Sequence, residues 1–358
     1  MPERSDRIRV AIAGCGNIAG PYARSLVGYP ETELVGIADL ELERAEALAS
    51  RVGCRAYPTL EAVLADAGVD LVVNLTIHHA HYAVTKACLE AGKHVYSEKP
   101  LAMTFAEAQA LVDLARNQGL RLGCSPFTFL GEAQQAAWRL IREGRLGTVR
   151  VAYAEVNWGR IESWHPAPGP FYEVGALFDV GVYPLTLLTA VFGSARQILA
   201  YGKVLHPDRV TKRGESFRIE TPDFVTAVLE LASGALARLT TNFYVPQQSK
   251  QSGVEFHGDL GSLHLASWQN PDSTLEFAPF GKLYEEVRLP KEKMHWGRGV
   301  QEMAGAMLAG RPHRATGEQA AHVVDILSAD AQSMREGGPV AVRSSFTPPA
   351  PNDLQPDL

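Results

Sequence analysis

The sequence predicts an α/β Rossmann-type domain, followed by an α+β domain with a mostly antiparallel, open-faced sheet. From residue 8 to about residue 123, short β-rich runs alternate with helical patterns, which is typical of a parallel sheet with crossover helices. After residue 124 most strands follow one another without helices between them. At 358 residues, 46% hydrophobic and 21% charged, the chain can form two cores. We therefore expect a first domain over residues 1–123, a second over 124–345 and a flexible, proline-rich tail over 346–358.

In the first domain, each predicted strand is a short apolar run bounded by turn residues. One helix carries its own start signal, because Thr104 and Glu107 form a capping box and Gly119 ends the pattern. The strands expected here are residues 8–13, 33–38, 71–75, 94–97 and 120–124.

The second domain begins with an amphipathic helix near residues 134–143, a strand near 148–157 and a buried apolar helix. A hairpin with a Ser233-Gly234 turn follows, and two helices close the domain, the second opened by Thr316 and Gln319. The later strands expected are residues 224–231, 235–243, 254–257, 262–265, 275–278 and 284–289.

Charge and composition exclude several classes of partner. The net charge of -6, without a cluster of basic and aromatic residues, argues against nucleic acid. No apolar run approaches the roughly 20 residues of a membrane span, and the charged N-terminus is unlike a signal peptide, so we expect a cytoplasmic location. The cysteines, at positions 15, 54, 88 and 124, match neither a metal site nor a disulfide framework.

A glycine-rich turn follows the first strand and opens a helix, in the pattern G-x-G-x-x-A. Gly14 permits the tight turn, Gly16 lets a pyrophosphate approach the backbone, and Ala19 allows close packing of helix and sheet. Asn17 and Ile18 lie at the helix N-terminus, whose positive dipole end favours phosphates. This context predicts dinucleotide binding.

Asp39 ends the second strand, where a carboxylate can accept hydrogen bonds from ribose hydroxyls and repel a 2'-phosphate. NAD is therefore the expected cofactor. Alternatively, Asp39 only caps the helix expected over residues 41–51, and Arg44 leaves NADP open.

Three histidines follow the strand at 71–75. His78 and His79 are adjacent and cannot share a helical face, and no acidic ligand accompanies them, so we expect no metal. Because the carboxyl end of a central strand is where a dinucleotide lies, Thr76 and His81 are expected to border the nicotinamide.

The tripeptide Glu98-Lys99-Pro100 places a cation at the end of a predicted strand. Pro100 restricts Lys99 to extended backbone and permits a cis peptide, so the chain itself would aim the side chain. There Lys99 can contact a substrate hydroxyl beside the nicotinamide. We expect Glu98 to be one of the cofactor-binding residues. Without this context the tripeptide would be read as a solvated loop.

Seven motifs along the chain together are typical of one known protein family. They are GCGNIA (14–19), Asp39, TIHHAH (76–81), AGKHV (91–95), EKP (98–100), GALFDVGVY (175–183) and GRPHR (310–314). Through them nearly the whole chain resembles the glucose-fructose oxidoreductase and inositol dehydrogenase (Gfo/Idh/MocA) family. The resemblance implies a two-domain NAD(P)-dependent oxidoreductase acting on sugars, polyols or related compounds. It also implies a dinucleotide-binding first domain, a substrate-binding second domain and a homodimer or homotetramer joined through the C-terminal sheet.

By the same resemblance, Lys99 corresponds to the active-site lysine and Asp179 to a substrate-domain carboxylate. Many members have histidine four residues after that aspartate, where this chain has Tyr183. Because tyrosine titrates near 10, it needs a cation such as Lys99 to act as a base near neutrality. On a helix Asp179 and Tyr183 share a face, although Pro184 either sits in the first turn or kinks the helix.

A proline-braced loop, residues 164–172, precedes the Asp179 segment and can present His165 or Tyr172 to a substrate. A purely structural role for this loop is equally consistent with its sequence. Phe127 is a further substrate candidate, and both Phe127 and Trp296 also fit a core or rim position. Two alternative functions stay open: NAD-dependent glycoside cleavage, and a non-catalytic nucleotide and sugar sensor. Such sensors tend to lose the lysine, so Lys99 favours an enzyme.

Overall fold

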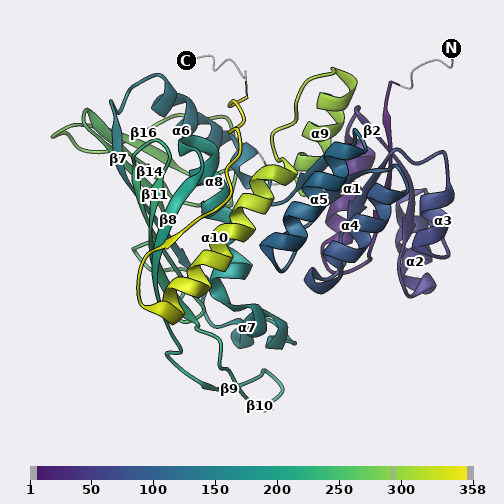
Figure 1. Cartoon of the computed structure of the whole chain (residues 1–358), viewed down its shortest axis with the longest axis horizontal. Helices are drawn as coiled ribbons and strands as arrows, with labels where there is room; N and C mark the ends of the chain where they lie inside the picture. The colour runs from purple at the N-terminus through teal and green to yellow at the C-terminus, as the bar shows by residue number, and fades with distance from the viewer. Residues whose placement is uncertain (1–5, 292, 294, 353–358) are drawn as a thin grey trace. The chain divides into compact units, whose positions relative to one another are not determined.

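The computed structural model describes residues 6–291, 293 and 295–352, and the chain divides into two compact units (Figure 1). The first unit consists of residues 1–127 and 295–324, and the second of residues 128–294 and 325–358. The division falls within helix α10 (Gly317–Glu336), so each unit takes one part of that helix.

The first unit is built on a six-stranded parallel sheet in the order β3-β2-β1-β4-β5-β6. This is the Rossmann order, with the switch point between β1 and β4. Each predicted strand is confirmed, with ends shifted by up to two residues. The strands are β1 (Ile8–Ala13), β2 (Thr32–Ala38), β3 (Arg55–Tyr57), β4 (Leu71–Asn74), β5 (His94–Ser97) and β6 (Leu122–Cys124).

Strand β3 has no counterpart in the prediction, because it is a three-residue edge strand with one exposed and one half-buried residue. The helices of this unit are α1 (Ala19–Gly28), α2 (Leu42–Val52), α3 (Leu60–Ala65), α4 (His81–Glu90), α5 (Phe105–Asn117) and α9 (Arg298–Leu308).

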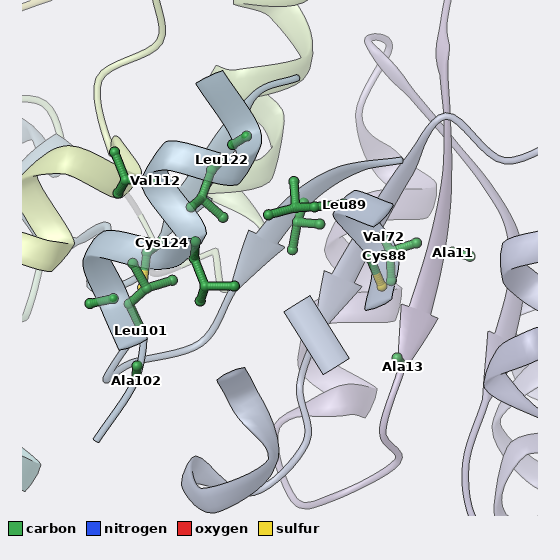
Figure 2. Close-up of a cluster of buried hydrophobic side chains, with 14 of the residues drawn as sticks. Ala11, Ala13, Val72, Cys88, Leu89, Leu101, Ala102, Val112, Leu122 and Cys124 are labelled. Carbon is green, nitrogen blue, oxygen red and sulfur yellow. The ribbon is translucent and has the colours of Figure 1, made fainter. Parts of the chain in front are cut away.

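The core of this unit lies between the sheet and the helices beside it (Figure 2). Ala11 and Ala13 of β1 bring small side chains to this layer, and Val72 of β4 pairs with Ala11. Cys88 and Leu89 of α4 are fully buried against them. Small residues on the central strand let the helix approach the sheet closely.

Helix α5 begins as predicted. The Glu107 amide donates to Thr104 Oγ1 at 3.3 Å, and the Thr104 amide donates to Glu107 Oε2 at 3.2 Å, which completes the capping box. Gly119, with φ of 65°, lies just beyond the end of the helix.

The second unit is built on a nine-stranded sheet in the order β16-β15-β14-β13-β7-β12-β11-β8-β17. Only the β7–β12 pair is parallel, which confirms the mostly antiparallel sheet. Its strands are β7 (Val149–Asn157), β8 (Ala195–Lys203), β11 (Phe224–Leu231), β12 (Leu236–Asn242), β13 (Gly253–Gly258), β14 (Gly261–Leu265), β15 (Leu275–Pro279), β16 (Glu285–Glu286) and β17 (Val340–Ala341).

A separate ribbon of β9 (Asp208–Val210) and β10 (Ser216–Arg218) projects below the larger sheet in Figure 1. The strand expected at 284–289 is reduced to two exposed residues at the edge of the sheet. Strands β8, β9, β10 and β17 have no counterpart among the strands expected from the sequence. In β8 the apolar run is broken by exposed or half-buried positions, and the other three are only two or three residues long.

Helices cover one face of this sheet. The unit contains α6 (Glu132–Arg142), α7 (Gly169–Ala176), a π-helical turn (Leu177–Gly181), α8 (Val182–Phe192) and the end of α10. Ser333 of α10 accepts a hydrogen bond from the Ala200 amide at 2.9 Å, and Gly202 leaves room for the sulfur of Met334. Contrary to the expectation that no apolar run approaches a membrane span, one helical stretch among the described residues, Gly169–Phe192, has the length and composition for one. In the fold, 72% of its apolar window is buried.

Candidate active site

The glycine-rich turn lies at the switch point of the parallel sheet. Gly14 has φ of 103°, and a Cβ there would lie 2.8 Å from the carbonyl carbon and oxygen of Leu75, so only glycine fits. At Gly16 a Cβ would meet open space. Helix α1 begins three residues later, with half-buried Ile18 at its N-cap and Asn17 exposed beside it. This open backbone at a helix N-terminus fits a dinucleotide pyrophosphate.

Asp39 ties the end of β2 to that turn. Its Oδ2 accepts a hydrogen bond from the Cys15 amide at 2.6 Å, and its Oδ1 accepts one from the Glu41 amide at 2.9 Å. The N-cap of α2 is Glu41, so Asp39 shapes the turn before the helix. Burial, together with the Asp39 charge, raises the pKa of the Cys15 thiol to about 12, so that thiol is neutral.

A cavity of about 490 Å³ lies beside the same turn, between α1 and α2. Gly16 and Asn17 line one side, and Arg24, Arg44 and Arg51 contribute three exposed guanidinium groups. Arg44 pairs with Glu41 at 2.8 Å, an exposed contact that contributes little stability.

The loop after β4 is held by its own side chains. Asn74 Oδ1 accepts hydrogen bonds from the Thr76 amide and hydroxyl, and its Nδ2 donates to the His81 carbonyl and to Thr85 Oγ1. The buried His81 ring lies 2.7 Å from the Pro100 carbonyl oxygen and 3.0 Å from that of Thr76. Burial lowers the pKa of His81, and a neutral ring has one N–H, so it donates to one of these carbonyls at a time.

His81 thus joins the loop after β4 to the Lys99-Pro100 segment. The rings of His78 and His79 lie against each other, with centroids 4.1 Å apart. Over residues 6–291, 293 and 295–352, no three histidine, cysteine or acidic side chains are grouped so that they could hold a metal ion.

Glu98 is a buried carboxylate that fixes the backbone before Lys99. Its Oε1 accepts hydrogen bonds from Tyr22 at 2.6 Å and Ser125 at 2.9 Å, and its Oε2 accepts one from the Lys99 amide at 3.1 Å. The Lys99–Pro100 peptide is cis, the isomer that the sequence permits. Burial, and next the Glu98 charge, raises the pKa of Tyr22, so Tyr22 remains a neutral donor to Glu98.

In the second unit, Asp179 lies on the π-helical turn and Tyr183 on the first turn of α8. Pro184 occupies the third position of α8, where its missing N–H costs little, and the π turn precedes it. The Tyr183 ring lies against Trp268, with centroids 4.9 Å apart.

The proline-braced loop is anchored by a buried ionic network. The Arg209 side chain, which is 0% exposed, donates to Glu162 at 2.9 Å and to the Tyr172 hydroxyl at 2.6 Å, and also pairs with buried Asp223. The Tyr172 hydroxyl donates in turn to Glu162. Burial, and next the hydrogen bond to Glu162, raises the pKa of Tyr172. In the structure Tyr172 is therefore one of the residues that anchor the loop.

His165 is half-buried in the same loop, beside Trp164 and Phe171, and its Nδ1 lies 2.8 Å from the Ala167 carbonyl oxygen. Phe127 is 5% exposed and packs in the first unit, close to Gly299.

The candidate residues fall into one set in each unit. The first unit brings the glycine turn, Asp39, Thr76, His81, Glu98 and Lys99 to the carboxyl edge of its sheet, and the second holds Asp179, Tyr183, His165 and Tyr172. The residues that contact these sets but were not among the candidates expected from the sequence are Tyr22, Ser125, Trp158, Trp268 and Arg209. For Trp158 a signal existed, since it directly follows a predicted strand.

Family models match both halves of the chain. One, described as an oxidoreductase family with an NAD-binding Rossmann fold, matches residues 8–125. The other, described as a GFO/IDH/MocA C-terminal domain, matches residues 134–264. The chain belongs to the GFO/IDH/MocA family. Its first unit is therefore an NAD-binding Rossmann domain, as the sequence predicted.

Several proteins resemble the chain over part or most of its length. A dTDP-3,4-didehydro-2,6-dideoxy-α-D-glucose 3-reductase from Streptomyces violaceoruber is 34% identical over 57% of this chain and 59% of its own length, less than two thirds. A trans-1,2-dihydrobenzene-1,2-diol dehydrogenase from Mus musculus is 28% identical over 69% of this chain and 73% of its own. The crystal structure of an NAD-binding oxidoreductase from Klebsiella pneumoniae superposes with a TM-score of 0.84 over 95% of this chain and 100% of its own, at 21% identity, and so shows the shared fold.

Proposed function

We propose that this protein is an NAD(P)-dependent dehydrogenase or reductase that acts on a CH–OH or carbonyl group of a sugar, polyol or related ring compound. The observation that carries the proposal is the placement of Lys99. Gly14, Thr76 and Lys99 follow β1, β4 and β5, three neighbouring strands of the parallel sheet, at their carboxyl ends. Named relatives that reduce a dideoxy sugar nucleotide or oxidise a cyclic diol support this substrate class.

The residues of the first unit fit a dinucleotide. Gly14 and Gly16 would hold the pyrophosphate, Asp39 the adenosine ribose, and Thr76 and His81 the nicotinamide side. Bound NAD supplies a hydride acceptor, and NADH a hydride donor. Lys99 would donate a hydrogen bond to the reacting oxygen, on a backbone held by Glu98 and His81.

The second unit would supply the proton chemistry. Tyr183 would take the hydroxyl proton during oxidation and return it during reduction, while Asp179 orients Lys99 or a substrate hydroxyl. A free tyrosine titrates near 10, so the Lys99 ammonium would stabilise its ionised form. In this proposal Lys99 would act on two atoms, the reacting oxygen and the Tyr183 oxygen.

The deciding experiment is a panel of sugars, inositols and cyclic diols assayed with NAD and NADP for net formation of reduced nicotinamide. Lys99→Ala should abolish turnover and leave NAD affinity nearly unchanged, because its side chain serves the substrate. Lys86→Ala is the matched control, since Lys86 pairs with Glu90 on an exposed helix face. Wild-type turnover in Lys99→Ala would refute the assignment. A free sugar released from a glycoside without net reduced nicotinamide would instead indicate glycoside cleavage.

Tyr183→Phe tests the proton acceptor separately. The phenylalanine keeps the ring against Trp268 but removes the hydroxyl, so kcat should fall and the limb of its pH profile that belongs to Tyr183 should disappear. If the profile keeps its shape, another group is the base.

We also propose that the second unit joins a second copy of this chain through the open face of its nine-stranded sheet. Five large apolar side chains on this face are 36–62% exposed: Tyr153, Leu199, Tyr201, Val228 and Leu236. The register places Val228 opposite both Leu199 and Arg238, and Arg238 opposite Tyr153, so the exposed row crosses four adjacent strands. An exposed apolar row of this kind is typical of a protein interface.

A further inference from the structure

The second unit contains a cavity of about 670 Å³ to which the proposed function assigns no role. It lies where β7 and β12 give way to loops. The residues that decide its chemistry are Trp158, Arg160, Ser163, Trp164, Tyr244 and Gln247.

Its walls are aromatic and unusually exposed. Trp164 is 42% exposed and Tyr244 37% exposed, although both are large rings. The rings of Trp158 and Trp164 meet edge to face, with centroids 6.1 Å apart at 89°, so each supports the other. Rigid aromatic faces that remain open to a cavity favour a flat or apolar ring as the ligand.

The cavity also carries one positive charge. The Arg160 guanidinium carbon lies 4.6 Å from the centre of the Tyr244 ring, a cation–π contact that leaves its N–H donors available. Arg160 is the only charged side chain among the described residues that line the cavity. Glu162, two positions along, is already paired with Arg209 at 2.9 Å. Within the described chain Arg160 has no carboxylate partner, so the charge favours an anionic ligand.

Ring contacts connect this cavity with Tyr183. Trp158 lies 5.6 Å from Trp268, and Trp268 lies 4.9 Å from Tyr183, both between ring centroids. The loop that carries Trp268 is held in place by buried Gln134, whose side-chain amide donates to the carbonyls of Ser267 and Asn270. The cavity is thus two ring contacts away from the proposed proton acceptor, and all of these residues belong to the second unit.

We propose that this cavity binds the non-reacting part of the substrate, and that this part is a planar ring joined to an anion. The ring would stack on Trp164 or Tyr244, and Arg160 would bind the anion. A sugar linked to a nucleoside diphosphate has this chemistry, and its sugar end would lie toward Tyr183. The inference rests on the proposed function, because it assigns a substrate class to the same site.

Three probes separate the two halves of the ligand: dTDP, which has ring and charge, thymidine, which has only the ring, and inorganic pyrophosphate, which has only the charge. Binding is measured by isothermal titration calorimetry on the full chain in saturating NAD, which occupies the cofactor's own pyrophosphate site. We expect dTDP to bind more tightly than either half. Equal affinity for dTDP and pyrophosphate would overturn the proposal.

Substitutions test which residue binds the ring of the ligand and which binds its anion. Arg160→Gln should weaken dTDP binding about tenfold and leave thymidine unchanged, whereas Trp164→Ala should weaken both. Arg213→Gln, on the exposed turn between β9 and β10, is the matched control and should change neither. Unchanged dTDP affinity in Arg160→Gln would refute the anion site.

The same measurements distinguish this inference from the proposed function. Specific dTDP binding without hydride transfer to or from any sugar would refute the proposed function and support the binding site in the cavity. Oxidation of free sugars by a protein that does not bind dTDP would keep the function and overturn the inference.

Discussion

The Asp39 carboxylate uses both of its oxygens on backbone amides, one in the glycine turn and one before α2. Ribose hydroxyls would therefore meet a carboxylate that is already held in place, with lone pairs to spare on each oxygen. We expect Asp39 in this position to favour NAD over NADP through its charge, in addition to shaping the turn.

Asp39→Asn tests this double role. Asparagine has one acceptor oxygen, so its NH₂ group would face the amide of Cys15 or Glu41, at a cost of about 1–3 kcal/mol. We expect the Kd for NAD, measured by titration, to rise about tenfold or more. Asp113→Asn, which alters an exposed pair with Arg116 on α5, is the control. An unchanged Kd would show that the turn does not depend on Asp39.

Asp330 gives a prediction about stability. This residue of α10 is 2% exposed, its Oδ1 has no hydrogen-bond partner among the described residues, and burial raises its pKa to about 7 from an ordinary 3.8. Because the folded state holds the proton more tightly than the unfolded state, the carboxyl is tolerated below about pH 4. Its destabilising effect grows up to about pH 7 and is constant above that.

Asp330→Asn should therefore raise the free energy of unfolding at pH 8 by at most about 4 kcal/mol, and by almost nothing at pH 4. Urea unfolding at pH 4, 6 and 8 measures this. A gain that is equal at every pH would mean that the carboxyl does not titrate in this range.

At the scale of elements, the strands of the first unit could be predicted because each is an apolar run between turn signals and helical patterns. The capping box at Thr104 and the glycine turn are local signals of the same kind. The aromatic cavity could not be predicted, because Trp158 and Trp164 follow β7 whereas Tyr244 follows β12, far along the chain, and the folded sheet brings them together. The partners of Glu98 escaped for the same reason, since Tyr22 and Ser125 are 76 and 27 residues away.

The glycine turn offers a matched pair of variants. Gly14→Ala would force a positive φ on alanine and press its Cβ against Leu75, so the free energy of unfolding should fall by about 2 kcal/mol. Gly16→Ala has open space and should unfold like the wild type while binding NAD more weakly, because the methyl group occupies the approach of the pyrophosphate. Thermal unfolding and NAD titration measure both effects. Equal stabilities for the two variants would contradict the geometry of the turn.

At the scale of the whole molecule, the proposed interface on the open face of the nine-stranded sheet predicts an oligomer. Val228→Glu would place a charge at the centre of the exposed apolar row, opposite Leu199. Size-exclusion chromatography with light scattering should show a wild-type oligomer and a folded variant that is monomeric or dissociates at lower dilution. Leu40→Glu, on a fully exposed residue of the first unit, should leave assembly unchanged. A wild-type monomer at all concentrations would refute the interface.

One guanidinium group anchors both flanks of the loop that carries Trp164 and His165. Arg209 contacts Glu162 on one side of this loop and Tyr172 on the other, in a network that is almost fully buried. The loop between these anchors contributes an open aromatic ring to the cavity, whereas the anchors themselves do not line it. Ligand preference and structural integrity therefore reside in different side chains. A lineage could exchange the residues at 163–167 to accept new substrates while retaining Arg209, Glu162 and Tyr172, and would keep a folded enzyme at each step.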